Sequence, residues 1–281
     1  MTRALSSRAR AGARGRAAVA AAVAVAAATL AGLAGGGCAG PPRSADPAAF
    51  RPVGEPDPAQ ASELGARDLY PTLFAHPDRL EPAAARFRVV SGEHAGADAV
   101  RTLRAVADDD ALAPEGARWV LEWSIEGVEP SPLQATFLMI DGAGALVSPR
   151  VVNADRDSIT DFEPPLVAVP ASMAAGEPVE REHAMVVRAF GDPSRVTQRG
   201  EGTNTLTLRG AQAVEAGDRR LDGVRLDTRF RASFGPADVD RTTRRWYAHS
   251  DGSLLAEAWD ESIKVFGLVT ERRTRAAVRA D

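Results

Sequence analysis

Cys38 is the only cysteine of the 281-residue chain, and its surroundings give the clearest indication of chemistry in the sequence. An uncharged run rich in Ala, Val, Leu and Gly spans residues 17–37 and ends directly before it. A basic segment precedes that run, with arginines at five positions: Arg3, Arg8, Arg10, Arg14 and Arg16. A basic start, an apolar middle and a small-residue end are the three parts of a secretory signal peptide. We therefore expect residues 1–37 to be an export signal and the Cys38 thiol to be the site of lipid attachment.

Three interpretations of this leader remain open. In the first, the chain is cut before Cys38 and the thiol carries a fatty acid such as palmitate. Gly37 fits the small residue that precedes the cysteine of a bacterial lipobox, whereas Gly35 stands where that motif prefers Leu. In the second, an ordinary signal peptidase cuts nearby and Cys38 has no role. In the third, the run stays as an uncleaved anchor, because its length is close to the ~20 residues that span a bilayer. We favour the first, which predicts an exported protein anchored on the periplasmic or cell-surface side of a membrane.

The residues that could serve catalysis or bind a metal do not form a recognisable motif. The four histidines, His76, His94, His183 and His249, are not at metal-ligand spacings, and no second cysteine could help. No G-x-S-x-G elbow occurs, and the S-x-x-K pattern fails because Glu261 stands three residues before Lys264. We therefore predict no metal, no cofactor and no enzyme. The alternative is a secreted hydrolase with a dispersed active site, since the members of a Ser-His-Asp triad need not be close in sequence.

One polar segment, residues 153–158, is similar to the start of a calcium-binding loop. Asn153, Asp155 and Asp157 have the spacing of loop positions one, three and five. However, Ser158 replaces the glycine of position six, and Pro164 replaces the glutamate of position twelve. We therefore expect a polar turn at this place and not a calcium site.

Two further groups of residues could contact a ligand. Arginines gather at six positions near the C-terminal end: Arg225, Arg229, Arg231, Arg241, Arg244 and Arg245. They could hold an anionic ligand or lipid headgroup, but we favour a solvated face on which they pair with Asp227, Asp238 and Asp240. The four tryptophans, Trp119, Trp123, Trp246 and Trp259, are expected in the core, or else around an apolar ligand cavity. The sequence assigns no ligand-binding residue.

The composition of the chain bears on its partners, its disulfides and its domain boundaries. The formal net charge is −4 although the leader is basic, which argues against a nucleic-acid partner. One cysteine cannot form an internal disulfide. Prolines among small and polar residues follow Cys38, so we expect residues 38–66 to comprise the lipidated cysteine and a disordered linker. Residues 67–281 are then the folded domain.

The pattern within this domain is that of β-strands. Trp119, Leu121 and Trp123 alternate with polar residues, and residues 224–234 alternate apolar even positions with charged odd positions. No helical period is evident between the strands, which argues against a parallel sheet. The predicted fold class is mainly β: a single curved antiparallel sheet or half-barrel-like meander of about eight to ten strands.

Several short motifs resemble a family of exported bacterial proteins of unknown function, many of them lipoproteins. The motifs are the pair Tyr70-Pro71, a strand ending in aromatic residues at 119–123, the Pro-Pro-Leu segment 163–166, the turn 175–177 and the segment 246–252, WYAHSDG. The last corresponds to a Trp-Tyr-Ala-x-x-x-Gly motif, with His249 and Ser250 where the family has Pro and Gly. The resemblance implies a curved antiparallel β domain in a non-catalytic envelope lipoprotein. The implied partners are the membrane, through the lipid anchor, and a lipid or other apolar ligand or an envelope protein. A structural or protein-interaction module is a further alternative.

Overall fold

A computed structural model describes residues 50–61, 63–75 and 81–280 of the chain. The chain divides into Met1–Cys38 and Ala39–Asp281, and all the described residues belong to the second unit. The predicted signal peptide, the Cys38 lipidation site and residues 39–49 of the linker lie outside the described residues. Within the described ranges, no helix is long and apolar enough to cross a membrane.

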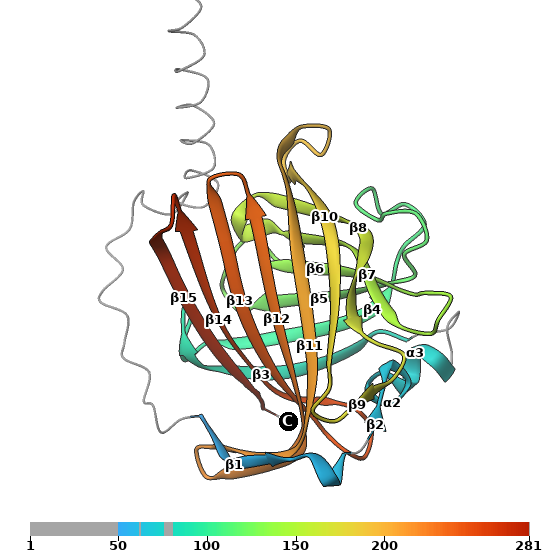
Figure 1. Ribbon diagram of the computed structural model, residues 1–281, viewed down its shortest axis with the longest axis vertical. Helices are drawn as coiled ribbons and strands as arrows, with labels where there is room; N and C mark the ends of the chain where they lie inside the picture. Colours follow the sequence, from blue (N-terminus) through green and yellow to red (C-terminus); the bar gives the residue numbers. More distant parts are fainter. Residues whose placement is uncertain (1–49, 62, 76–80, 281) are drawn as a thin grey trace, which may run out of the picture. The chain divides into compact units, whose positions relative to one another are not determined.

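Most of the described chain is an antiparallel meander. Its strands are β3 (Ala83–Gly92), β4 (Asp98–Ala105), β5 (Trp119–Ile125), β6 (Gln134–Ile140), β7 (Leu146–Asn153), β8 (Ser158–Val169), β10 (Pro178–Ala189), β11 (Val196–Ala216), β12 (Arg219–Phe234), β13 (Ala237–Tyr247), β14 (Leu254–Val265) and β15 (Leu268–Arg279). Strands that follow one another in this series pair side by side. In Figure 1, β10 to β15 cross in front of β4 to β7.

The sheet is closed, which corrects the prediction of a half-barrel-like sheet with about eight to ten strands. β15 pairs with β3, so the last strand of the meander meets the first. In the described part of the chain the sheet has 13 strands, and all except β1 (Arg51–Asp57) belong to the ring. Closure satisfies the backbone groups that two sheet edges would leave unpaired. Alternation within each strand reveals an inward face but does not reveal whether distant strands meet.

The predicted alternation is confirmed on β12. Val224, Leu226 and Ala232 are buried inside the ring, whereas Arg229 and Arg231 are exposed. Strand β6 lies in the core, because both of its faces contribute buried residues. Phe230, on the even-numbered face of β12, is half-buried and packs its ring 6.2 Å from that of Phe162.

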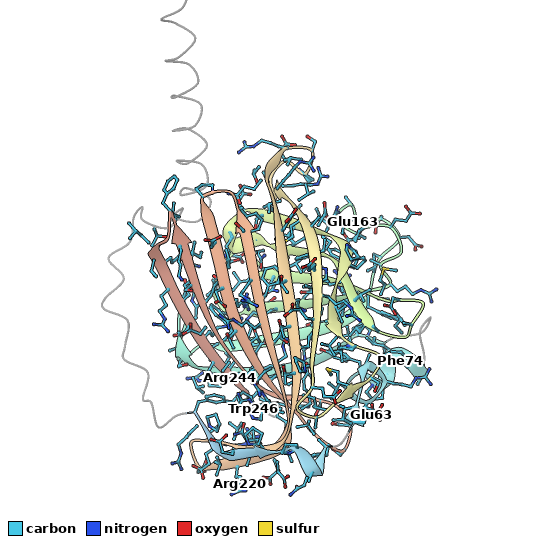
Figure 2. The ribbon with its side chains drawn as sticks, viewed as in Figure 1. Glu63, Phe74, Glu163, Arg220, Arg244 and Trp246 are labelled. Carbon is cyan, nitrogen blue, oxygen red and sulfur yellow. The ribbon has the colours of Figure 1, made fainter. Side chains whose placement is uncertain are left out.

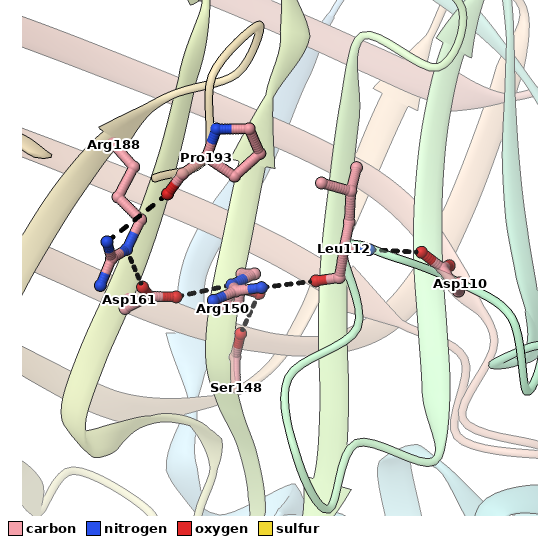
Figure 3. Close-up of polar contacts among 7 residues, drawn as sticks. All are labelled: Asp110, Leu112, Ser148, Arg150, Asp161, Arg188 and Pro193. Carbon is pink, nitrogen blue, oxygen red and sulfur yellow. Dashed lines mark hydrogen bonds and ion pairs between the residues drawn. The ribbon is translucent and has the colours of Figure 1, made fainter. Parts of the chain in front are cut away.

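The outer face of β5 to β8 is covered by the loop between β4 and β5. Arg150 donates through Nε to Asp161 (2.6 Å) and through Nη1 to the carbonyl oxygen of Leu112 in that loop (2.8 Å). Arg188 binds the second oxygen of Asp161 at 2.9 Å, so three strands and the loop share one polar network (Figure 3). Beneath the loop lies a second apolar cluster that includes Val120.

The linker predicted over residues 38–66 is wrong for its described C-terminal part. Arg51–Asp57 forms β1, which pairs with the extended end of β11. The ring of Phe50 packs edge-on 5.5 Å from that of Trp246, which is labelled beside this end of the sheet in Figure 2. Proline-rich composition was compatible with an edge strand, and only the long β11 supplies a partner for it.

Short elements close the same end of the ring. They are η2 (Pro58–Gln60), β2 (Glu63–Leu64), which pairs with β9 (Met173–Ala174), and the helices α2 (Ala66–Leu69) and α3 (Pro71–Ala75). Leu69 and Leu73 of the two helices are buried in the main apolar cluster. The turn after β13 packs on α2 at Gly252, whose φ is +67°.

Leu226 and Arg229 provide a test of the two faces of β12. Leu226→Ala should destabilise the fold by about 2–5 kcal/mol, because it leaves a cavity in the core. Arg229→Ala should cost less than about 1 kcal/mol, because Arg229 forms only an exposed ion pair with Asp240. Urea unfolding of both variants measures the difference. Equal losses would mean that the two faces are wrongly assigned.

Gly252→Ala should destabilise the protein by about 1–3 kcal/mol. A Cβ at this position would lie 2.5 Å from the Asp68 carbonyl oxygen, in addition to straining a left-handed backbone. Gly217→Ala is the matched control, because Gly217 has φ +62° but open space around it. Thermal unfolding should show the larger loss for Gly252→Ala. A loss no larger than that of the control would contradict the packing of this turn on α2.

Candidate functional site

The inner face of the ring carries charged side chains on neighbouring strands. β13 and β14 each direct every second residue inward, as strands do. Their register places Arg241 opposite Glu261 and Arg245 opposite Glu257, all four on the inner face. An interior of this kind differs from the apolar core expected inside a curved sheet.

Three of these side chains, Arg241, Arg245 and Glu257, border a cavity of about 100 Å³. Its wall includes Arg101 of β4, Leu121 and Trp123 of β5, Gln134 and Thr136 of β6, Arg241 and Arg245 of β13, Glu257 of β14 and Arg275 of β15. Tyr70 enters from the junction of α2 and α3, which closes this end of the ring. A second cavity of about 40 Å³ shares Trp123, Gln134, Arg241 and Arg275 with the first, and Arg156 and Arg273 also line it.

Ion pairs compensate part of the interior positive charge. Arg245 donates through Nε to Glu257 at 2.6 Å, and Arg156 donates through Nη2 to Glu261 at 2.6 Å. Arg273 pairs with Glu271. The carboxylate side chain of Glu261 is only 4% exposed and that of Glu257 15%, so both depend on these partners for the interactions that water would otherwise provide.

Two arginines of the larger cavity lack such a partner. Arg101 donates to the Tyr70 hydroxyl at 2.9 Å. Arg275 stacks between two indoles, with its Cζ 4.9 Å from the Trp123 ring centre and 5.3 Å from that of Trp259. Of the four arginines in this wall, Arg245 alone has a carboxylate oxygen within hydrogen-bond distance in the described part of the chain. The nearest one to Arg241 belongs to Glu261, at 3.9 Å.

The interior charges shift the pKa of Glu257 strongly. Burial alone would raise this pKa, but the positive charges of Arg245, Arg275 and Arg241 lower it to about 2. Burial lowers the pKa values of Arg241 and Arg275, although the nearby carboxylate of Glu257 acts in the opposite direction on both. The wall of the larger cavity carries four arginines against the carboxylates of Glu257 and Glu122, so it offers donors and positive charge to an anionic group.

The arginines predicted to share one solvated face are divided between the two faces. Arg229 is exposed and pairs with Asp240, as expected for a solvated face. Arg225 pairs with Asp227 on the outer face but is half-buried over Trp246. Arg241 and Arg245 instead point into the cavity.

The tryptophans also divide into two groups. Trp119 and Trp246 are buried, as expected for core residues. Trp123 is also buried in the main apolar cluster, as expected, but its ring borders a polar cavity beside arginines. Trp259 is half-buried and lines the same polar cavity, which is neither of the two expected environments. The indole Nε1 groups of both lack a hydrogen-bond partner in the described protein.

The remaining candidate residues lie in other parts of the ring. His183 is buried and donates through Nδ1 to the Pro164 carbonyl oxygen at 2.9 Å, where β8 separates from β10. The segment 153–158 forms the single turn η3 (Ala154–Arg156), with Asp157 in a left-handed conformation. Among the described residues, no three His, Cys, Asp or Glu side chains gather as metal ligands would.

Two motifs of the family resemblance meet in space. Tyr70 of the aromatic-Pro pair packs its ring 6.2 Å from that of Tyr247 in the 246–252 segment. The same segment supplies Gly252, which packs on α2. The residues that suggested the resemblance thus hold the helices against the end of the ring.

Sequence reasoning missed Arg101, Glu257, Glu261, Arg273 and Arg275. A usable signal was present, because Glu257, Trp259 and Glu261 share one parity on a strand, as do Arg273 and Arg275 on the next. Apolar and polar residues do not alternate clearly along either strand, so odd or even position alone did not indicate which face was buried.

Comparison with known proteins gives little guidance. No protein-family model matches the chain, and no curated protein matches it in sequence. Among solved structures, the chain is similar to the hypothetical lipoprotein YmcC from Escherichia coli (K12), at 7% identity and a TM-score of 0.33. The match covers 74% of this chain and 94% of that one. A likeness at this level does not support an argument about function.

Glu257 provides a test of the interior charges. Because its folded-state pKa is lowered from 4.5 to about 2, its contribution to stability is present above about pH 4.5 and is lost as the pH falls towards 2. Glu257→Gln should cost about 3 kcal/mol at neutral pH and reduce the loss of stability across that window.

Denaturant unfolding across the same pH window measures both effects. Glu126→Gln, at an exposed position, is the control and should follow the wild-type pH profile. A Glu257→Gln profile parallel to that of the wild type would contradict the lowered pKa.

Proposed function

We propose that the protein is a non-catalytic envelope lipoprotein, tethered to a membrane through Cys38. The observation that carries the proposal is the leader itself, in which a basic segment and an apolar run end at a lone cysteine. The resemblance of several motifs to exported bacterial lipoproteins supports the same proposal.

The position of the first described residue is compatible with such a tether. The described fold begins at Phe50, so residues 39–49 separate Cys38 from it. Because an extended residue spans about 3.3–3.6 Å, this segment keeps the domain within about 40 Å of the anchored cysteine. The domain would therefore act close to the membrane surface.

The interior favours a binding role for a polar group over a lipid-carrying role. The larger cavity has a volume of about 100 Å³ and four arginines in its wall. Such a space holds only a few water-sized groups, and burying an acyl chain there would strip water from the charges without replacing it. Any apolar ligand or envelope partner would have to use another surface.

The hydrolase alternative places its active site around His183 or His249. His183 uses Nδ1 to hold β8, and His249 lies in the turn between β13 and β14. Neither histidine lines the arginine cavities. Loss of an esterase or amidase activity on His183→Ala or His249→Ala would favour this alternative over the proposed function.

Cys38→Ser in the full-length chain tests the tether. The variant should move from the membrane fraction to the soluble fraction, because serine cannot form the thioether that carries the lipid. Ser44→Ala, in the tether, is the control and should stay with the membrane. Mass spectrometry of the wild-type N-terminal peptide should show an acylated Cys38. An unmodified N-terminus at another position, with Cys38→Ser still membrane-bound, would contradict the proposal.

A further inference from the structure

We propose that the cavity between β4, β5 and β13–β15 binds one small oxyanion of the phosphate or sulfate type, held by Arg101, Arg241 and Arg275. This site does not depend on the lipid tether. It rests on three features of the cavity, which are unmatched donors, an imbalance of charge and the placement of the arginines, and its size then restricts the ligand.

The first feature is an excess of donors over acceptors. Each guanidinium has five N–H groups and no acceptor. Arg101 has the Tyr70 hydroxyl as its acceptor, and Arg275 has only the faces of Trp123 and Trp259. Most of the N–H groups of these two guanidiniums therefore lack an acceptor among the described residues. An oxyanion supplies the acceptors that these donors lack.

The second feature is the imbalance of charge around the cavity. Glu257 is the inward carboxylate of this wall, and its side chain is bound by Arg245. Glu122 also borders the cavity, but its carboxylate binds Arg104 at 2.5 Å. Arg101, Arg241 and Arg275 therefore surround the space with no carboxylate in hydrogen-bond contact. A bound dianion would neutralise most of the positive charge of these three arginines.

The third feature is the arrangement of the arginines around two tryptophans, Trp123 and Trp259. Arg101 lies directly beside Trp123 in the β4–β5 register, and Arg275 stacks on the ring of Trp123. Arg241 stacks on the second tryptophan, with its Cζ 4.7 Å from the Trp259 ring centre. Stacking fixes the planes of the guanidinium groups, so that less conformational freedom is lost when an anion binds.

Size restricts the ligand. A volume of about 100 Å³ accepts a tetrahedral oxyanion with a few waters, but not a nucleotide or a sugar acid. A purely structural role explains the cluster less well. Paired charges can fill an interior, but unpaired buried charges are destabilising, and apolar residues would fill the same space at lower cost.

Indole NMR of the wild-type full-length protein tests the site without any substitution. Titration with phosphate, or with sulfate, in a chloride buffer should shift the ¹H–¹⁵N indole signals of Trp123 and Trp259. The signal of Trp246 should stay in place, because its Nε1 donates to Gln212 on the outer face. Acetate, as a third titrant, distinguishes a site for tetrahedral oxyanions from one for any carboxylate.

Calorimetry of two matched variants locates the binding. Arg275→Gln should weaken phosphate binding about tenfold or more, because a charged donor is lost. Arg229→Gln, which changes an exposed arginine paired with Asp240, should bind as the wild type does. If Arg275→Gln does not fold, Arg241→Lys, which keeps the charge, takes its place and should still weaken binding.

Three results would overturn the proposal. They are no indole shift with phosphate or sulfate in the millimolar range, equal shifts of Trp246 and the two cavity tryptophans, and unchanged affinity in the interior variants.

Discussion

The pairing of β15 with β3 converts a meander into a ring, and the rest of the domain depends on this closure. An open sheet could leave one face to solvent, but a closed one directs every second residue inward. Inward charges must then find partners across the ring or water within it. On the inner faces of β13 and β14, two arginines lie opposite glutamates in the register: Arg241 opposite Glu261 and Arg245 opposite Glu257.

The ends of the ring are closed by different means, and this determines where the interior stays polar. At the end that holds α2 and α3, Leu69 and Leu73 extend the apolar core, and Tyr70 meets Arg101 and Tyr247 at its boundary. Towards the opposite end, a smaller apolar cluster around Phe162 fills the space. The arginine cavity adjoins the first of these clusters, which keeps its charges away from bulk solvent.

The sequence was sufficient to predict the chain's β character, its antiparallel connections and the buried face of β12, because each follows from local alternation. It was not sufficient to predict closure, which depends on strands far apart in the chain. The sequence also led to a wrong prediction at β1, where a proline-rich segment expected to be a linker pairs with the extended end of β11. The interior site was missed for a related reason: Arg241 and Arg244 look alike in sequence, and only register places one inside and the other outside.

The central claim is that inward-facing charges of the closed sheet are coupled to one another within the ring. A double-mutant cycle on Arg245 and Glu257 measures this coupling most directly, with each residue replaced by Met singly and together. We expect each single variant to be destabilised, the double variant to recover much of the loss, and the coupling free energy to be about 1–3 kcal/mol. Strictly additive losses would place the two side chains in solvent and contradict the inward orientation of β13 and β14.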